Sequence, residues 1–199
     1  MMSLCVNTWV NMGRWEADAA GRFRAAAIEL FGEIGYEQTT VCAIAERAGL
    51  TSRTFFRYFA DKREVLFDGT QRLQQLMVDS LCQAPTDASP LDAVAAAVMK
   101  AGDFFDDERR PFSRLRHLVI SANPDLHERE LIKLARLSAA LAAALRARGV
   151  EEPDASLVAE TGLAVFRIAF AQWVAESEER GYAEILNLFL ARLKALTAH

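Results

Sequence analysis

The sequence predicts an all-α protein of about nine helices, and three observations support this fold class. Apolar residues recur at helical spacing through most of the chain, whereas the alternation of apolar and polar residues that marks a strand is nowhere sustained. Alanine, the strongest helix former, is abundant. The few prolines lie between the periodic segments rather than inside them, at Pro85, Pro90, Pro111, Pro124 and Pro153.

Three helices are expected at the N-terminal end, each with suitable residues at its boundaries. They span Ala19–Ile34, Val41–Ala48 and Ser52–Phe59. Gly35 suits the left-handed backbone that ends the first helix, and Gly49 ends the second. The threonine hydroxyls of Thr39-Thr40 and of Thr51 are available as N-caps of the second and third helices.

The rest of the chain is expected to form six helices separated by short breaks. They span Asp61–Cys82, Leu91–Phe105, Pro111–Ser121, Asp125–Arg148, Asp154–Glu176 and Ala183–Thr197. The segment PTDASP, residues 85–90, is the clearest linker. Residues 1–17 carry no regular apolar stripe, so we expect a flexible arm there, or an over-long start that precedes Met12.

The formal net charge is −4, but this charge is unevenly distributed along the chain. Between Arg47 and Arg63, five basic residues accompany Asp61 as the only acidic residue, which gives a local charge of +4. From Glu64 onward, fifteen basic and twenty acidic residues give −5. A small basic end on an acidic body is typical of a protein that touches DNA at one end only.

Several classes of protein are not expected from the sequence. It has no nucleophile–base pair, no phosphate-binding glycine loop and no cluster such as H-E-x-x-H, so we expect no enzyme, no cofactor and no metal site. Cys5, Cys42 and Cys82 have neither metal-type nor disulfide-framework spacing and fit a reducing interior. No run reaches the roughly 18 apolar residues that a membrane span needs, so we expect a cytoplasmic protein without a membrane partner.

Residues 44–59, IAERAGLTSRTFFRYF, have the pattern of a helix-turn-helix. Gly49 lies in the turn, Ala45 is small where the helices cross, and Leu50 fills the space between them. A corner between two helices of an unrelated bundle would show the same turn. The third helix is too short and polar for core packing, however, and arginine on an exposed helix commonly reads guanine edges in a major groove. Its outward polar residues are Ser52, Arg53, Thr54 and Arg57.

The same region resembles a known family. The pattern A-x-x-L-F-x-x-x-G-Y-x-x-T-T begins at Ala27, and I-A-x-x-A-G-L-T-x-x-x-x-F-x-Y-F-x-D-K begins at Ile44. From about Arg22 to Leu66 the chain is therefore similar to the N-terminal domain of the TetR family. The resemblance implies a DNA-binding domain over residues 18–63 and a helical body over 64–199 that dimerises and binds a ligand.

The resemblance also implies roles for individual residues. Thr40 and Val41 begin the helix that lies across the DNA backbone, with Thr40 positioned for a phosphate. Tyr58 and Lys62 match the family's phosphate-contacting aromatic residue and lysine, so loss of Lys62 should weaken all duplexes alike. Phe56 replaces the usual tyrosine, and it either loses a phosphate hydrogen bond or contacts a thymine methyl group. The recognition helix carries Thr51, Ser52, Arg53, Thr54 and Phe56, of which Arg53 is expected to read bases.

The helical body offers an expected subunit interface. The segment Asp154–Glu176 is apolar nearly all round, so this helix must be covered on more than one side. A twin subunit would supply the second cover in a two-fold four-helix interface; the alternative is a central helix buried within one subunit. The expected interface residues are Leu163, Val165, Trp173, Ile185, Phe189 and Leu193.

A largely apolar ligand cavity is expected near the aromatic residues of the body. Its expected lining is Phe104, Phe105, Phe112, Leu115, Leu118, Phe166 and Phe170, with His117 to orient a polar group. The alternative is a filled core, because phenylalanines at helical spacing usually pack together. Arg114, Arg116 and Arg167 would suit a carboxylate, a phosphate or a coenzyme A portion. The segment ANPDLHERELIK, followed by ALAAALRARGV, is similar to TetR-family bodies associated with acyl-CoA-like ligands.

These expectations combine into one function. The recognition helices of a homodimer would enter successive major grooves of a palindromic operator, roughly 34–36 Å apart. A small, largely apolar effector would favour a state with the wrong spacing and so release the DNA, which makes the protein a repressor. The alternatives are a DNA-binding regulator without ligand control and an activator, because promoter position decides the outcome of the same contact with DNA.

Overall fold

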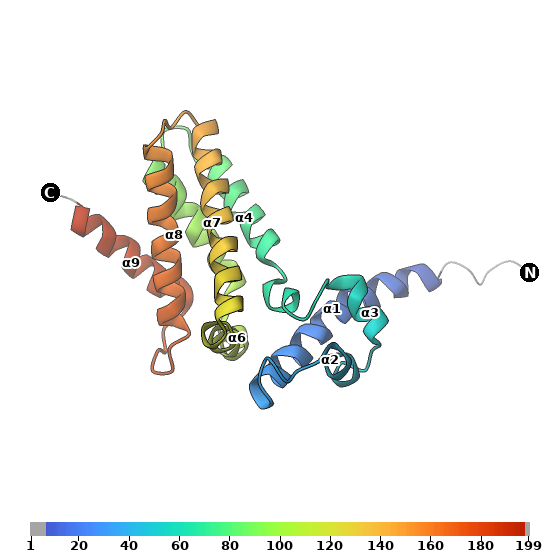
Figure 1. Ribbon diagram of the computed structural model, residues 1–199. Coiled ribbons are helices and arrows are strands. Elements are labelled where there is room, and N and C mark those ends of the chain that lie inside the picture. Colours follow the sequence, from blue (N-terminus) through green and yellow to red (C-terminus); the bar gives the residue numbers. More distant parts are fainter. Residues whose placement is uncertain (1–6, 198–199) are drawn as a thin grey trace, which may run out of the picture. The chain divides into compact units, whose positions relative to one another are not determined.

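A computed structural model of the chain describes the backbone of residues 7–197 and the side chains of residues 19–197 (Figure 1). The described residues form helices, turns and loops without a strand, which confirms the all-α prediction. The chain folds into two compact units. One holds the residues up to Asp68 together with Leu118–Asn123, and the other holds Gly69–His117 and the residues from Pro124 onward. The first division lies five residues beyond the expected domain boundary.

The N-terminal unit is built from three α-helices and a short 3₁₀-helix. These are α1 (Asn7–Glu33), α2 (Val41–Arg47), α3 (Ser52–Tyr58) and η1 (Glu64–Phe67). Thr40 accepts a hydrogen bond from the backbone N–H of Ala43, and Thr51 accepts one from Thr54, so both expected N-caps are confirmed. Phe23 of α1 is fully buried among apolar side chains of α2 and α3.

The first helix begins at Asn7 rather than at Ala19, so the predicted flexible arm is wrong for residues 7–17. Residues 1–6 of that arm lie outside the described residues. The segment 7–18 contains no proline and Gly13 as its only glycine. Extending an existing helix fixes one residue for each hydrogen bond gained, so a segment with few helix breakers continues a helix that is already formed.

The predicted helix Asp61–Cys82 is also wrong at its start. Residues 64–67 form η1, the chain turns at Gly69 with a φ of +87°, and α4 begins only at Thr70 (Thr70–Cys82). Val65, Leu66 and Phe67 are all buried. Successive side chains of an α-helix point about 100° apart, so three consecutive residues do not all face one core without a local change of the backbone.

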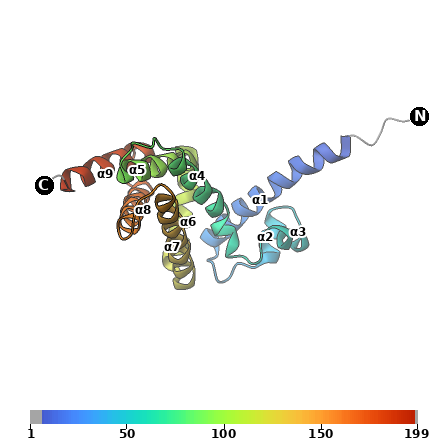
Figure 2. The same cartoon turned by 90° about the horizontal axis from the view of Figure 1, so that it is seen from above.

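The second unit packs α4 against α5 and α7, and α8 against α5, α7 and α9 (Figure 2). Its elements after α4 are α5 (Pro90–Ala101), η2 (Gly102–Phe104), η3 (Asp107–Arg109), α6 (Arg110–Ala122, whose last residues group with the first unit), α7 (Pro124–Ala147), α8 (Asp154–Trp173) and α9 (Tyr182–Thr197). These helices match the expected ones apart from their ends. Helix α8 therefore lies at the centre of the unit, covered by three neighbours.

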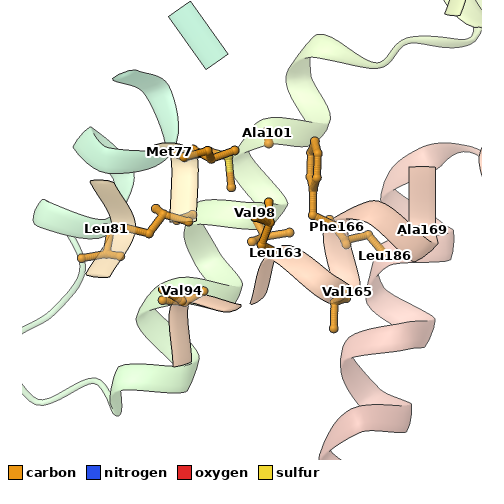
Figure 3. Close-up of a cluster of buried hydrophobic side chains, with 14 of the residues drawn as sticks. Met77, Leu81, Val94, Val98, Ala101, Leu163, Val165, Phe166, Ala169 and Leu186 are labelled. Atoms are coloured by element: carbon orange, nitrogen blue, oxygen red, sulfur yellow. The ribbon is translucent and has the colours of Figure 1, made fainter. Parts of the chain in front are cut away.

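The core of this unit draws side chains from α4, α5, α7, α8 and α9 (Figure 3). Met77 of α4, Val98 of α5, Phe166 of α8 and Leu186 of α9 all belong to one buried cluster. Helices α5 and α8 approach each other closely at Gly162. A Cβ atom at this position would lie 2.1 Å from Cγ1 of Val94, far inside van der Waals contact. The crossing therefore depends on the missing side chain of Gly162.

Gly162→Ala should lower the free energy of unfolding by about 1–3 kcal/mol, because the added methyl group must displace the stiff Val94 side chain. Urea or thermal unfolding followed by circular dichroism measures this loss. Gly102→Ala is a matched control, since its Cβ would meet the nearest atom, Cδ1 of Tyr182, at an ordinary 3.6 Å. Adding Val94→Ala to Gly162→Ala should recover part of the loss. Wild-type stability of the single variant would contradict the close approach.

Candidate functional site

The turn between α2 and α3 is held by a side chain of α1. Gly49 has a φ of +64°, in the region that favours glycine, and the N–H of Leu50 bonds the carbonyl of Ala45 at 2.9 Å. The Arg22 guanidinium donates a short hydrogen bond to the carbonyl of Ala48 and a longer one, 3.5 Å, to that of Gly49. A Cβ on residue 49 would lie 2.8 Å from Nη2 of Arg22. The angle between the two helices is thus fixed from α1.

The outward face of α3 is exposed and carries both charged and aromatic side chains. The inward face of the helix is formed by Phe55, which is fully buried and packs edge-on against Phe23 with ring centroids 5.2 Å apart. Arg53 and Arg57 point outward, and Phe56 between them is 57% exposed. A large aromatic ring this exposed on a short helix contributes little to the fold. The sequence prediction of an outward recognition surface therefore agrees with the burial pattern.

The remaining predicted DNA-binding residues lie at the starts of α2 and α3 and at the end of α3. Thr40 and Thr51 are exposed N-caps, and the hydroxyl groups of Thr51 and Thr54 lie 2.9 Å apart. Val41 and Ser52 are the first residues of their helices and are half-buried. These residues lie at two helix N-termini, Thr40 and Val41 at α2 and Thr51 and Ser52 at α3, where unpaired backbone N–H groups favour an anion.

Few of the five basic residues between Arg47 and Arg63 project freely. Arg47 makes two hydrogen bonds to Glu33, at 2.9 and 2.7 Å, and these hold the pKa of Glu33 below its usual value. Arg63 pairs with Asp61 at 2.6 Å. Among the described residues, no side-chain hydrogen bond or ion pair engages Arg53. The positive charge available to a partner is therefore concentrated on α3 rather than spread over the segment.

Arg57 and Tyr58 form a pair at the end of α3. Nη2 of Arg57 donates to the Tyr58 hydroxyl at 3.1 Å, and the guanidinium lies 5.1 Å from the centre of the Tyr58 ring. Because the hydroxyl oxygen accepts this bond, its own proton stays available to donate to a phosphate. The arrangement fits the phosphate contact expected of Tyr58.

Lys62 has a different environment from the one expected. Its ammonium group donates to three backbone carbonyls, those of Tyr36, Glu37 and Thr39, at 2.7, 3.2 and 3.0 Å. An ammonium has three N–H groups, and all three are used here. While these bonds are made, no N–H group of Lys62 is left for a phosphate, so the phosphate contact expected of Lys62 stays a prediction. These bonds could not be predicted from local sequence, because the carbonyls belong to a loop 23 to 26 residues away.

The expected subunit-interface residues lie mainly in the interior of a single chain. Leu163, Val165, Trp173 and Ile185 are buried, and Phe189 and Leu193 pack half-buried against the same core. The four buried residues therefore have little surface left for a second subunit, while the interface role expected of Phe189 and Leu193 stays a prediction. Helix α8 is apolar on several faces, and the sequence alone does not tell which face turns inward. Its exposed apolar residues are Leu157, Ala164, Ile168 and Ala171, spaced three, four or seven apart.

Most of the expected ligand-lining residues fill space instead of enclosing it. Phe105 contacts the rings of Phe166 and Phe170, at centroid distances of 5.9 and 5.3 Å, as well as those of Trp173 and Tyr182. This cluster corresponds to the filled-core alternative. His117 lies beside Phe170 at 5.9 Å. Leu115 is half-buried, whereas Phe112 and Leu118 are 36% and 58% exposed, so they do not enclose a cavity.

The arginines considered for a charged ligand group are also engaged within the body. Arg114 donates to the carbonyls of Val174 and Ala175 at 2.8 and 2.9 Å, and so caps the end of α8. Arg116 bonds Glu130 of α7 at 3.1 Å. Arg167 is exposed. These contacts give Arg114 and Arg116 structural partners in the absence of a ligand.

A cavity of about 490 Å³ lies beside Phe104 instead. The Arg72 guanidinium lies over the Phe104 ring, 5.2 Å from its centre. The other lining residues are Gln75, Leu76, Asp79, Lys100, Asp103, Asp106 and Arg109. Phe104 is the one residue of the expected ligand lining that borders this cavity, and the polar character of the other lining residues differs from the apolar lining expected. Over residues 7–197, no helix is long and apolar enough to cross a membrane.

Comparisons with known proteins agree with this geometry. The family model described as bacterial regulatory proteins, tetR family, matches residues 23–68, and the MftR C-terminal domain model matches residues 88–198. The HTH-type transcriptional regulator TcmR of Streptomyces glaucescens is 30% identical over 156 residues, which cover 74% of this chain and 69% of TcmR.

Solved structures share the fold at low sequence identity. A protein from Syntrophomonas wolfei assigned to the TetR family has a TM-score of 0.68 and 17% identity, over 92% of this chain and 96% of that one. FadR of Bacillus subtilis, described as a transcriptional regulator in complex with stearoyl-CoA, has a TM-score of 0.56 and 20% identity, over 86% and 96% of the two chains. With one family model at the helix-turn-helix, a second over more than half of the chain, and TcmR aligned over most of its length, this protein belongs to the TetR family of DNA-binding transcriptional regulators.

Proposed function

We propose that the protein is a dimeric repressor that binds a palindromic operator and leaves it when an acyl-CoA-like ligand binds the helical body. One observation carries the DNA-binding part of this proposal. A seven-residue helix presents Arg53, Phe56 and Arg57 outward, while its inner face and its turn are fixed by Phe23 and Arg22. Such a regulator acts where its operator lies, in the cytoplasm.

Within this surface, Arg53 is proposed as the base-reading residue. It is exposed, and no other described side chain engages its guanidinium, so binding DNA breaks no intramolecular contact. A guanidinium matches the two acceptors of guanine in the major groove with two parallel hydrogen bonds. Phe56 beside it carries no hydroxyl, and we propose that it contacts a thymine methyl group rather than a phosphate.

Arg53→Ala should weaken binding to the specific operator by roughly 5- to 150-fold, the equivalent of about 1–3 kcal/mol, with a much smaller effect on random duplex. Fluorescence anisotropy with a fragment of the protein's own promoter and a scrambled duplex of the same length measures both affinities. Arg146→Ala serves as a control, because Arg146 is an exposed arginine paired with Glu152 on the second unit. Equal losses on the two duplexes would remove the base-reading role of Arg53.

We further propose that the exposed apolar stripe of α8 contacts a second copy of the chain. Leu157 is 61% exposed and Ile168 is 58% exposed, which is high for large aliphatic side chains in an isolated chain. Ala164 and Ala171 continue the stripe, and small residues allow close approach of another helix. A palindromic operator is bound by a dimer with two-fold symmetry. Two copies of this stripe, packed against each other about the two-fold axis, would form such a dimer.

Ile168→Glu should shift the protein from dimer to monomer at micromolar concentration and reduce operator affinity in parallel, because the charge would be buried against its counterpart without a partner. Sedimentation velocity measures the first effect and anisotropy the second. Leu131→Glu places the same charge at an exposed leucine of α7, 42% exposed, and is expected to change neither. A dimer that tolerates Ile168→Glu would show that the interface lies elsewhere.

The ligand class is proposed from the fold relation to FadR and from the cavity beside Phe104. FadR of Bacillus subtilis is described with stearoyl-CoA, a molecule with an apolar chain and several phosphates. Arg72, Lys100 and Arg109 line the cavity. Lys100 and Arg109 are paired with Asp103 and Asp106 across exposed ion pairs, which exchange partners at little cost. A phosphate therefore has cations available to it there.

Stearoyl-CoA should weaken operator binding, whereas coenzyme A alone should not, because an apolar chain is needed to shift the helices of the body. Release from 99% to 1% binding-competent protein would require roughly 10⁴-fold tighter binding to the released state. Arg72→Gln should reduce the response to stearoyl-CoA without changing operator affinity in its absence. If stearoyl-CoA has no effect while Arg53→Ala behaves as expected, the ligand class is wrong and the DNA-binding role stands.

A further inference from the structure

We infer that Lys62 is a positioning residue for DNA binding, which locks the loop before α2 to the loop after α3 instead of contacting the operator. The inference rests on the proposed DNA-binding function of the N-terminal unit. It reverses the expectation drawn from the sequence, where Lys62 was a phosphate contact. The contacts that carry it all lie within this unit.

The first step is the site that receives the ammonium. The carbonyls of Tyr36, Glu37 and Thr39 converge on Nζ of Lys62 within 3.2 Å. Three carbonyl oxygens that point at one place repel each other unless a cation lies between them. The Tyr36 ring adds a further contact, with Nζ 4.3 Å from its centre. The ammonium therefore stabilises this arrangement of the three carbonyls, in addition to the bonds that Thr39 makes to Gly35 and Tyr36 within the loop.

The second step is the backbone that carries Lys62. Asp61 accepts hydrogen bonds at Oδ1 from the backbone N–H groups of Arg63 and Glu64, at 2.8 and 3.1 Å. Burial alone would raise the pKa of Asp61, but these bonds and those from the Arg63 guanidinium hold it below its usual value. Because the turn around Lys62 is fixed by its neighbours, the ammonium is held on the Tyr36–Thr39 loop rather than swinging freely.

The third step is what lies between the two loops. The helix-turn-helix runs from the N-cap Thr40, the residue directly after Thr39, to Phe59, three residues before Lys62. The contact of Lys62 therefore joins the entry and the exit of the whole motif. Groups that are already held in their bound arrangement bind with less loss of conformational freedom. Lys62 contributes to DNA affinity in this indirect way, through Thr40 and the orientation of α3.

The experiment compares Lys62→Met, Lys62→Arg and Lys194→Met in the full-length protein. Methionine keeps the length of the side chain without the donors. Arginine keeps the charge, but no nitrogen of its planar group carries three N–H bonds, so a single nitrogen cannot donate to all three carbonyls. Lys194 makes an exposed ion pair with Asp92 in the second unit and is the matched control for loss of one lysine. Operator affinity is measured by anisotropy over a series of salt concentrations, with melting temperature and dimerisation recorded beside it.

Both Lys62 variants should bind the operator on the order of tenfold more weakly, because each leaves carbonyls without their charged donor. The slope of affinity against salt should equal that of the wild type, and hydrogen exchange of residues 36–43 should become faster. Lys194→Met should bind as the wild type does.

Three results would overturn the inference. A salt slope reduced by about one in Lys62→Met, with full binding by Lys62→Arg, would identify a phosphate contact. A lower melting temperature with unchanged operator affinity would show a purely structural role. Loss of the folded N-terminal unit in both variants at the temperature of the assay would show that Lys62 is needed for folding itself. The response to Arg53→Ala separates each of these from a failure of the proposed DNA-binding function.

Discussion

The buried contact between Phe55 of α3 and Phe23 of α1 is the constraint on which the recognition surface depends. Helix α3 has seven residues, and isolated helices shorter than about 12 residues are marginal in water. It therefore exists only as long as a neighbour covers its inner face. Because Phe55 and Phe59 both pack against Phe23, the opposite face is left to Arg53, Phe56 and Arg57 by geometry alone. The contact between Phe55 and Phe23 thus decides which residues of α3 face outward, where a partner can reach them.

The charges around this helix divide into those that build the unit and those that project from it. Arg22 and Lys62 bond backbone carbonyls, while Arg47 and Arg63 bond carboxylates. Arg22, Lys62 and Arg47 each join segments that are distant in sequence, whereas Arg63 and Asp61 pair within one turn. The local excess of positive charge seen in the sequence therefore overstates the charge available to DNA. Specificity rests on few cations, which makes the position of each more important than their number.

The sequence predicted the positions of the helices well, but it predicted the contacts of individual side chains less well. Particular residues show the reasons. Threonine caps and apolar stripes depend on neighbours a few residues away, so the ends of α2 and α3 were found almost to the residue. The break before α4 was missed although Gly69 marks it, because the prediction includes the apolar residues Val65–Phe67 beside it in one continuous helix. The partners of Lys62 lie in a distant loop, and an apolar helix such as α8 has several stripes that look alike in sequence. Contacts between distant parts of the chain decide both the bonds of Lys62 and the inward face of α8.

The two stripes of α8 also explain how one helix serves both parts of the proposed function. Phe166 and Phe170 point inward to Phe105, while Ile168, midway between them in sequence, points outward. Side chains two apart on a helix lie about 200° around its axis, so the inner and outer faces move together when the helix turns or shifts. A ligand bound beside Phe104 that moves Phe105, the next residue, would change the packing on the inner face of the helix that carries the proposed subunit contact. Coupling between ligand and dimer geometry then needs no separate relay, because both act on the same rigid element.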